Sequence, residues 1–373
     1  MRDPRLDKMA QVLVSYSLNV NPGDNVWMMG EMGGLPLLEA LYEELIKAGA
    51  HVFYTLHPAG WDEIYFRNAS DKQLQRTCPF AASNINICNK RIRVEGMTNT
   101  RALSKVDPRK QALKSIANQP LLATTMQRSA NGELDWVVTL CPTQGLAQEA
   151  DMGILDYTDF VFRAAHLDEK DPVAFWQSQE KKQKKMVEFL EKKKQLHFKT
   201  NAGTDLVVNV EGMRWMNSCG KRNFPDGEVF TGPKEGGVDG IVRYTYPAIY
   251  HGTVVEDVEL IFEKGEVVQA TASKNEAFLH AMIKQDAGAS RLGEIAIGTN
   301  YRIESFSQNI LFDEKIGGTF HAALGAGYPE TKCTNQSGLH WDMICDLRQG
   351  GTIEADGEVI SKDGKFTQSG WPA

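Results

Sequence analysis

The chain has 373 residues, of which 42% are hydrophobic and 24% charged, and its formal net charge is -7. This composition is typical of globular proteins and excludes a largely disordered chain, while the negative charge argues against general nucleic-acid affinity. The length exceeds the size at which one hydrophobic core keeps growing, so we expect two domains.

The N-terminus, MRDPRLDKMAQVLVSYS, carries charges throughout and lacks the apolar core of a signal peptide. No apolar run elsewhere reaches membrane-spanning length. The six cysteines form no CxxC pair and are interpreted as reduced thiols. We therefore expect a cytoplasmic protein that binds neither nucleic acid nor membrane.

The N-terminal half alternates between helical and strand patterns. An apolar stripe at helical spacing opens the chain, and a strand over Asn25–Met29 follows an NPGD turn. A second helix ends near Gly49 and leads into a strand over 51–57. Because the alternation continues to a strand near Trp136, we predict a parallel α/β domain over residues 1–170.

Three glycines after the first strand, Gly30, Gly33 and Gly34, raise the question of a dinucleotide site. The G-x-G-x-x-G spacing is absent, and the second strand ends at His57 rather than at an acidic residue. We therefore predict no nucleotide site here.

Residues 171–195 are Lys-rich and helix-prone. Interspersed glutamates and an apolar stripe through Met186, Val187 and Leu190 favour a solvated helix over a nucleic-acid or membrane patch. We predict a linking helix here, before a third region, 196–373, with a different pattern.

Residues 196–373 show short alternating runs separated by hairpin turns at Lys264-Gly265 and Asp356-Gly357. One helix is expected near Asn275–Asp286. These patterns predict an α+β domain built on antiparallel strands, which we expect to carry a metal site.

Five side chains of this domain are of the types that ligate divalent metals, namely Glu228, Glu294, His321, His340 and Asp342. Each has an ordinary explanation alone, such as a solvated strand residue or a core histidine. In HWD, however, His340 and Asp342 share one face of a strand, which delivers two ligands from one short segment.

The number of candidate ligands indicates how many metal ions the site would hold. A catalytic zinc ion normally takes three protein ligands, so five suggest two ions that share a carboxylate. Two close ions can clamp a hydroxide and a carbonyl oxygen together, an arrangement used for hydrolysis.

Six stretches resemble the aminopeptidase T and aminopeptidase S family of metallopeptidases. Four are specific in combination: RNFPDGEVFTGP, GEIAIGTN, GTFHAALGAGYPE and SGLHWDMICDL. Two weaker ones, LVSYSLNVNPGDNV and LYEELIKAGAHV, extend the similarity over nearly the whole chain. The segment between Tyr328 and His340 is shorter than the family pattern.

The resemblance implies an exopeptidase that removes N-terminal residues from short peptides with two divalent ions, such as zinc, cobalt or manganese. It implies a homodimer. It assigns the metal ligands to Glu228, Glu294, His321, His340 and Asp342. We expect attack by a metal-bound hydroxide, with Glu294 as the bridging carboxylate and Tyr328 as a hydrogen-bond donor to the oxyanion.

Two alternatives stay open at this stage. His321, His340 and Asp342 alone match the facial triad of non-haem Fe(II) oxygenases, and ring-cleaving dioxygenases acting on dihydroxypyridines resemble the same family. This alternative does not require Glu228 or Glu294. The other is a metal-stabilised binding protein without turnover.

Overall fold

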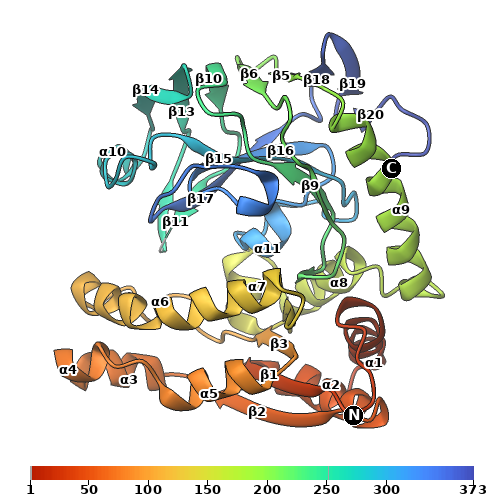
Figure 1. Ribbon diagram of the computed structural model, residues 1–373, viewed down its shortest axis with the longest axis vertical. Helices are drawn as coiled ribbons and strands as arrows, with labels where there is room; N and C mark the ends of the chain where they lie inside the picture. The colour runs from red at the N-terminus through yellow and green to blue at the C-terminus, as the bar shows by residue number, and fades with distance from the viewer. Residues whose placement is uncertain (1, 251) are drawn as a thin grey trace. The chain divides into compact units, whose positions relative to one another are not determined.

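The computed structural model describes residues 2–250 and 252–373. It divides into two compact units, Met1–Val173 with Gly220–Pro225, and Ala174–Cys219 with Asp226–Ala373. The sheet of the first unit is parallel and the two larger sheets of the second are antiparallel. The predicted fold class is therefore confirmed (Figure 1).

The first unit is built on a five-stranded sheet with the strand order β2-β1-β3-β4-β8. Its strands are β1 (Asn25–Glu31), β2 (His51–His57), β3 (Lys90–Glu95), β4 (Asp135–Leu140) and β8 (Asn223–Phe224). Its helical segments are α1 (Pro4–Val12), η1 (Leu13–Ser17), η2 (Met32–Gly34), α2 (Leu35–Lys47), α3 (Trp61–Asn68), α4 (Asp71–Leu74), α5 (Pro79–Ile87), α6 (Pro108–Ala130), α7 (Gln144–Glu149) and α8 (Ile154–Ala164).

The start of α1 shows why the first predicted helix forms. The Asp3 carboxylate accepts a hydrogen bond from the backbone N–H of Arg5, and Pro4 occupies the first helical position. The apolar stripe then buries Leu6 and Met9. The helix continues through η1 to Ser17, so the expected element is present.

The glycine-rich loop after β1 is a place of close backbone packing. A Cβ atom on Gly33 would lie 2.2 Å from the carbonyl oxygen of Gly96, and one on Gly96 would lie 2.2 Å from the backbone nitrogen of Gly34. Glycine is required here because a second segment of backbone occupies the space of a side chain.

Strand β8 comes from the later part of the sequence. Val138 and Thr139 of β4 pair in parallel with Asn223 and Phe224, and the Val138 N–H donates to the carbonyl of Arg222. The sequence pattern had placed this stretch within the region 196–373, whereas Gly220–Pro225 belongs to the first compact unit.

The second unit contains an eight-stranded sheet, a five-stranded sheet and a small hairpin. The eight-stranded sheet contains, in spatial order, β14 (Glu266–Thr271), β13 (Glu259–Glu263), β10 (Val238–Arg243), β6 (Asp205–Asn209), β5 (Gln195–Lys199), β18 (Thr352–Ala355), β19 (Glu358–Lys362) and β20 (Lys365–Phe366). The five-stranded sheet contains β17 (His340–Asp346), β16 (Thr319–Gly325), β15 (Leu292–Gly298), β9 (Glu228–Thr231) and β7 (Met216–Ser218). The remaining elements are the hairpin β11 (Ala248–Tyr250) and β12 (Thr253–Val255), and the helices α9 (Pro172–Leu190), α10 (Glu276–Ile283), α11 (Ile310–Asp313) and η3 (Pro329–Thr331).

The two large sheets of this unit form two layers with a shared apolar core (Figure 1). The rings of Phe198 on β5 and Phe320 on β16 lie 4.3 Å apart between centroids. Helix α9 adds Met186 and Leu190 to the same core. The five-stranded sheet therefore has one face against this core, which leaves its other face for polar side chains.

The predicted helix over 171–195 is too long, since α9 ends at Leu190 and Gln195 begins β5. The Asp356 carboxylate accepts hydrogen bonds from the backbone N–H groups of Lys194 and Gln195. The helix propensity of the lysine-rich run predicted a helix up to Gln195. These hydrogen bonds and the pairing of β5 with β18 instead give Gln195 an extended conformation.

Both predicted hairpin turns are confirmed. Lys264 and Gly265 have φ values of 51° and 86°, and Asp356 and Gly357 have φ values of 51° and 81°. Two consecutive positive φ values are typical of the turns that match the twist of antiparallel strands. The helix expected near Asn275–Asp286 is α10.

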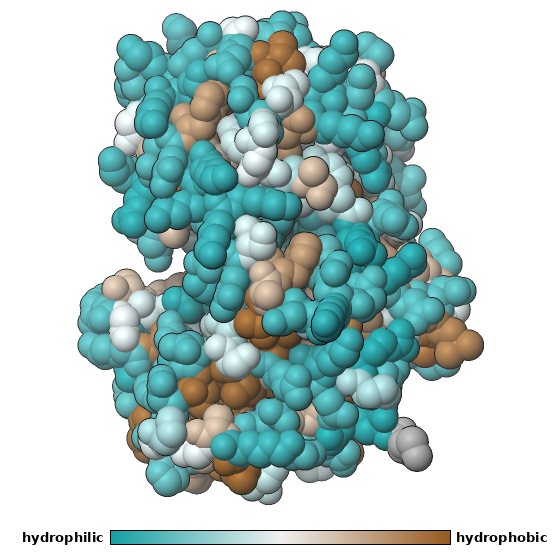
Figure 2. Space-filling view, turned by 90° about the vertical axis from the view of Figure 1, so that its right-hand side faces the viewer, coloured by the Kyte–Doolittle hydropathy of each residue, from teal (hydrophilic) through white to brown (hydrophobic). Residues whose placement is uncertain are grey.

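The surface of the protein is mainly hydrophilic on the face that can be inspected in Figure 2. On the face drawn in Figure 2, hydrophilic side chains dominate and apolar ones occur in separate groups. Within the described part of the chain, no helix combines the length and the apolar character that crossing a membrane requires.

Candidate metal centre

The polar face of the five-stranded sheet brings together the five predicted ligand residues. In the strand register, Glu294 pairs with Ala323, which pairs with Asp342 on β17. Ala296 pairs with His321. Paired residues of antiparallel strands project to the same face, so these side chains lie on one side of the sheet.

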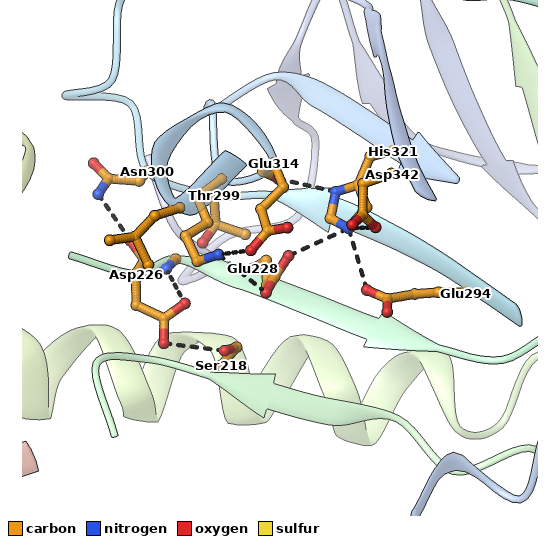
Figure 3. Close-up of polar contacts among 12 residues, drawn as sticks. Ser218, Asp226, Glu228, Glu294, Thr299, Asn300, Glu314, His321 and Asp342 are labelled. Atoms are coloured by element: carbon orange, nitrogen blue, oxygen red, sulfur yellow. Dashed lines mark hydrogen bonds and ion pairs between the residues drawn. The ribbon is translucent and has the colours of Figure 1, made fainter. Parts of the chain in front are cut away.

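The remaining ligand candidates extend the same face. Glu228 pairs with Gly298, and His340 pairs with Gly325. Small residues thus occupy positions beside the polar ones, which leaves space above the sheet. Figure 3 shows the carboxylates of Glu228, Glu294 and Asp342 converging on the ring of His321.

The distances define a compact cluster around the two imidazoles. His321 Nε2 lies 3.2 Å from Glu294 Oε1, 3.5 Å from Glu228 Oε2 and 3.9 Å from Asp342 Oδ1. His340 Nε2 lies 3.7 Å from Glu294 Oε2 and 3.5 Å from Asp342 Oδ1. Glu294 therefore presents one oxygen to each histidine.

Within the described part of the chain, three overlapping groups have ligand atoms within 4.8 Å of one another. They are Glu228 with Glu294 and His321, Glu294 with His340 and Asp342, and Glu314 with His321 and Asp342. The first two groups share Glu294, the residue expected to bridge two ions. Glu314 was not predicted from the sequence.

Backbone carbonyls set the orientation of both histidines. His321 Nδ1 lies 3.0 Å from the carbonyl oxygen of Glu314, and His340 Nδ1 lies 2.8 Å from that of Ala326. A carbonyl oxygen can only accept, so Nδ1 carries the proton in each ring. In the neutral imidazole this leaves the Nε2 lone pair facing the carboxylates, as a metal ligand requires.

Two buried carboxylate oxygens in the cluster lack a hydrogen-bond donor. Among the described residues, neither Glu228 Oε2 nor Asp342 Oδ1 receives a hydrogen bond. A buried carboxylate oxygen without a donor is costly, and a cation placed between such oxygens would satisfy both. The residues present therefore fit divalent metal ions.

The electrostatics of the metal-free cluster follow from burial and charge. Burial raises the pKa of Glu228 well above its usual range, although nearby Lys315 opposes this. Burial disfavours the charged form of His321, but the hydrogen bond to Glu294 and the surrounding carboxylates outweigh it and raise the pKa to about 10. The same competition raises the pKa of His340, chiefly through Asp342 and Glu294. Without metal, protons on the imidazoles offset the negative charge.

Lys315 is a member of this region that the sequence did not reveal. Its side chain is fully buried, and Nζ lies 3.6 Å from Glu228 Oε1 and is also paired with the Glu314 carboxylate. Burial disfavours its charge, but Glu228, Glu314 and Asp226 outweigh this and raise its pKa. The only signal was the charged DEK triplet ahead of two glycines, six residues before His321.

Gln183 and Asp226 hold the start of β9 in position, and Gln183 had no sequence signal. Buried Gln183 of α9 donates from Nε2 to the carbonyls of Ser218 and Glu228, at 2.8 Å each. The Asp226 carboxylate accepts from Ser218 Oγ at 3.0 Å and from the Gly227 N–H at 2.9 Å (Figure 3). These bonds hold the start of β9, where Glu228 enters the cluster.

Tyr328 lies in the loop after β16, beside the cluster. Its ring centroid is 5.4 Å from that of His340 and 5.5 Å from that of Phe230. Desolvation, together with the charges of Glu294 and Asp342, raises the pKa of the phenol. The hydroxyl therefore stays protonated, and able to donate, through neutral pH.

The polar face of the five-stranded sheet thus carries three carboxylates and two imidazoles, a ligand set that fits a metal-dependent enzyme. Residues 2–366 match the family described as thermophilic metalloprotease (M29), and the chain belongs to this family. The resemblance to aminopeptidases T and S is thereby confirmed, and the protein is a metalloaminopeptidase.

Individual relatives agree over nearly the full length. Aminopeptidase 2 of Geobacillus stearothermophilus is 26% identical in an alignment that covers 99% of this chain and 98% of the relative. The structure of wild-type AmpT from Thermus thermophilus has a TM-score of 0.86 at 23% identity and covers 98% of this chain and 99% of its own. That similarity shows the fold.

The fold is also similar to that of an oxygenase. The structure of 2,5-dihydroxypyridine dioxygenase from Pseudomonas putida KT2440 has a TM-score of 0.63 at 14% identity, covering 98% of both chains. A similarity at this identity speaks for the fold alone, and family membership decides for the hydrolase.

Proposed function

We propose that this enzyme removes N-terminal residues from short peptides, using two divalent ions such as zinc, cobalt or manganese. The proposed ligands are Glu228, Glu294, His321, His340 and Asp342. The observation that carries the proposal is the sharing of Glu294 between two ligand groups, one with Glu228 and His321 and the other with His340 and Asp342. One carboxylate bridging two ions needs this arrangement.

Divalent ions bound there would lower the pKa of a water molecule toward neutrality and polarise the peptide carbonyl. The protein's own groups complete the chemistry. The Nδ1 hydrogen bonds of His321 and His340 hold both rings with Nε2 toward the carboxylates. The Tyr328 phenol, protonated at neutral pH, would donate a hydrogen bond to the oxyanion that forms on the peptide carbonyl.

The two oxygens of Glu228 face different partners, and one of these partners is Lys315. Nζ of Lys315 lies on the Oε1 side of Glu228, while Oε2 faces His321. The carboxylate would thus present one oxygen to an ion and the other to a fixed ammonium. The expected homodimer and the cytoplasmic location remain predictions.

The test is hydrolysis of leucyl-p-nitroanilide by protein stripped with a chelator, before and after addition of zinc, cobalt or manganese. We expect release that depends on added metal and disappears in Glu294→Ala. The bound metal is counted in parallel by elemental analysis, with two ions per chain expected. One iron per chain, no release from any aminoacyl anilide, and oxygen uptake with a dihydroxypyridine would support the dioxygenase instead.

A further inference from the structure

Strand β9 carries an apolar ring next to the ligand cluster. Glu228 and Phe230 are two residues apart on this strand and project to the same face, while Val229 between them is buried in the core of the sandwich. Phe230 pairs with Ala296 on one side and with Met216 of β7 on the other. Ala296 thus places only a methyl group beside Phe230 on the side of the cluster.

A second apolar wall comes from the loop that carries Tyr328. The rings of Tyr328 and Phe230 lie 5.5 Å apart with an interplanar angle of 57°, so they form an angled pair. Tyr328 also contacts His340, and the centroids of these two rings lie 5.4 Å apart. The Tyr328 ring therefore contacts both the apolar Phe230 and a proposed metal ligand.

Close backbone packing holds this wall in place. A Cβ atom on Gly232 would lie 2.4 Å from Cys333 Cβ, and one on Gly327 would lie 2.3 Å from Cys333 Sγ. The Thr331 hydroxyl donates to the Tyr328 carbonyl at 2.7 Å. The loop is thus fastened to the end of β9, which makes a preformed surface rather than a mobile one.

Met216, Phe230 and Tyr328 are more exposed than three of the five proposed ligands, while His340 and Asp342 are themselves half-buried. Glu228, Glu294 and His321 are buried, whereas Met216 and Phe230 are half-buried and Tyr328 is 38% exposed. An apolar surface left accessible beside a buried polar cluster can receive an apolar group of a ligand.

The opposite end of the polar face has a different character. Asp346, two strand positions beyond Ile344 on β17, accepts hydrogen bonds from Arg348 and from the Tyr246 hydroxyl. Its charge is already satisfied within the protein. The half-buried apolar side chains Met216 and Phe230, by contrast, lie on the neighbouring strands β7 and β9.

We infer that Met216, Phe230 and Tyr328 form the subsite for the side chain of the substrate's N-terminal residue, and that this subsite selects leucyl and phenylalanyl over glutamyl residues. The inference rests on the proposed function, since an aminopeptidase must place that side chain next to the ions that activate the adjacent carbonyl. A charged side chain would lose its hydration on this surface without gaining a partner.

The first experiment compares kcat/KM for leucyl, phenylalanyl, alanyl and glutamyl p-nitroanilides. The wild type should favour the leucyl over the glutamyl substrate by about 100-fold, and Phe230→Ala should reduce the leucyl-to-alanyl preference by about tenfold. Val268→Ala removes a similarly apolar, 54% exposed side chain from β14 and should change neither ratio. Tyr328→Phe keeps the ring and should lower kcat while preserving the leucyl preference.

Metal content and melting temperature of Phe230→Ala are measured with the kinetics, and Met216→Ala serves as a second variant that leaves the Phe230 ring in place. Unchanged substrate ratios in both variants, with activity and bound metal retained, would overturn the subsite while leaving the proposed function standing.

A binding titration with free amino acids tests the proposed subsite independently of peptide hydrolysis. Isothermal titration of the metal-loaded enzyme with L-leucine and L-glutamate should show tighter binding of leucine, weakened in Phe230→Ala and not in Val268→Ala. Equal affinities for the two amino acids would refute the subsite. Leucine-selective binding without hydrolysis of any anilide would instead retain the subsite and reject the aminopeptidase proposal.

Discussion

The fully buried ammonium of Lys315 lies 3.6 Å from Oε1 of Glu228. This pair stands at the edge of a cluster that otherwise consists of carboxylates and imidazoles. Removing one partner of this pair should cost more stability than removing one partner of an exposed pair, because the remaining buried charge cannot be hydrated.

We predict that Lys315→Met destabilises the metal-free protein by about 3–5 kcal/mol, because it leaves Glu228 and Glu314 without their buried counter-charge. Urea unfolding of the two proteins measures the difference. Lys199→Met is the matched control, since Lys199 pairs with Glu354 at 3.2 Å but is 43% exposed. Its effect should stay within about 1 kcal/mol. Equal losses in the two variants would contradict the role of burial.

The metal-free protein should become less stable as pH rises from about 6.5 to about 10. Folding raises the pKa of His321 from 6.5 to about 10, so the folded state holds this proton more tightly than the unfolded state. The resulting stability is fully present below pH 6.5 and is lost as pH rises through the folded pKa.

Melting temperatures measured against pH in the presence of a chelator test this prediction. His321→Gln should flatten the slope, whereas His197→Gln, at a half-buried histidine on β5, should retain it. A melting temperature of the wild type that stays constant between pH 6.5 and 10 would rule out the proposed proton on His321.

Metal stoichiometry should distinguish the shared ligand from the unshared ones. If Glu294 contacts both ions, Glu294→Gln should lose both, while His340→Ala and Glu228→Gln should each lose chiefly one. Elemental analysis after dialysis against a defined metal buffer gives the counts. Retention of both ions by Glu294→Gln would show that another carboxylate bridges them.

Tyr328→Phe should lower kcat by about 100-fold or more while bound metal stays unchanged, because it removes a donor aimed at charge that develops only in the transition state. Steady-state kinetics with leucyl-p-nitroanilide and metal counting measure the two effects. Full activity of this variant would remove the phenol from the mechanism.

Local pattern was enough for many elements of the fold. The Lys264-Gly265 turn was predictable because two positive φ values demand particular residues, and the alternation in HWD was enough to place His340 and Asp342 on one face. The end of α9 could not be predicted from local pattern, because the hydrogen bonds that follow it go to the Asp356 carboxylate, more than 160 residues along the chain.

The sequence by itself was enough to identify the family, because its motifs resemble those of the family, and to predict the fold class, because hydrophobic periodicity distinguishes strands from helices. It also supplied the five candidate ligands, because their residue types bind divalent metals. Only the tertiary structure decided how these groups meet. The register that sets Glu228 beside Gly298 and His321 beside Ala296 depends on pairing between distant strands. The burial of Lys315 likewise depends on the acidic groups packed around it, and charge composition alone places lysine at the surface.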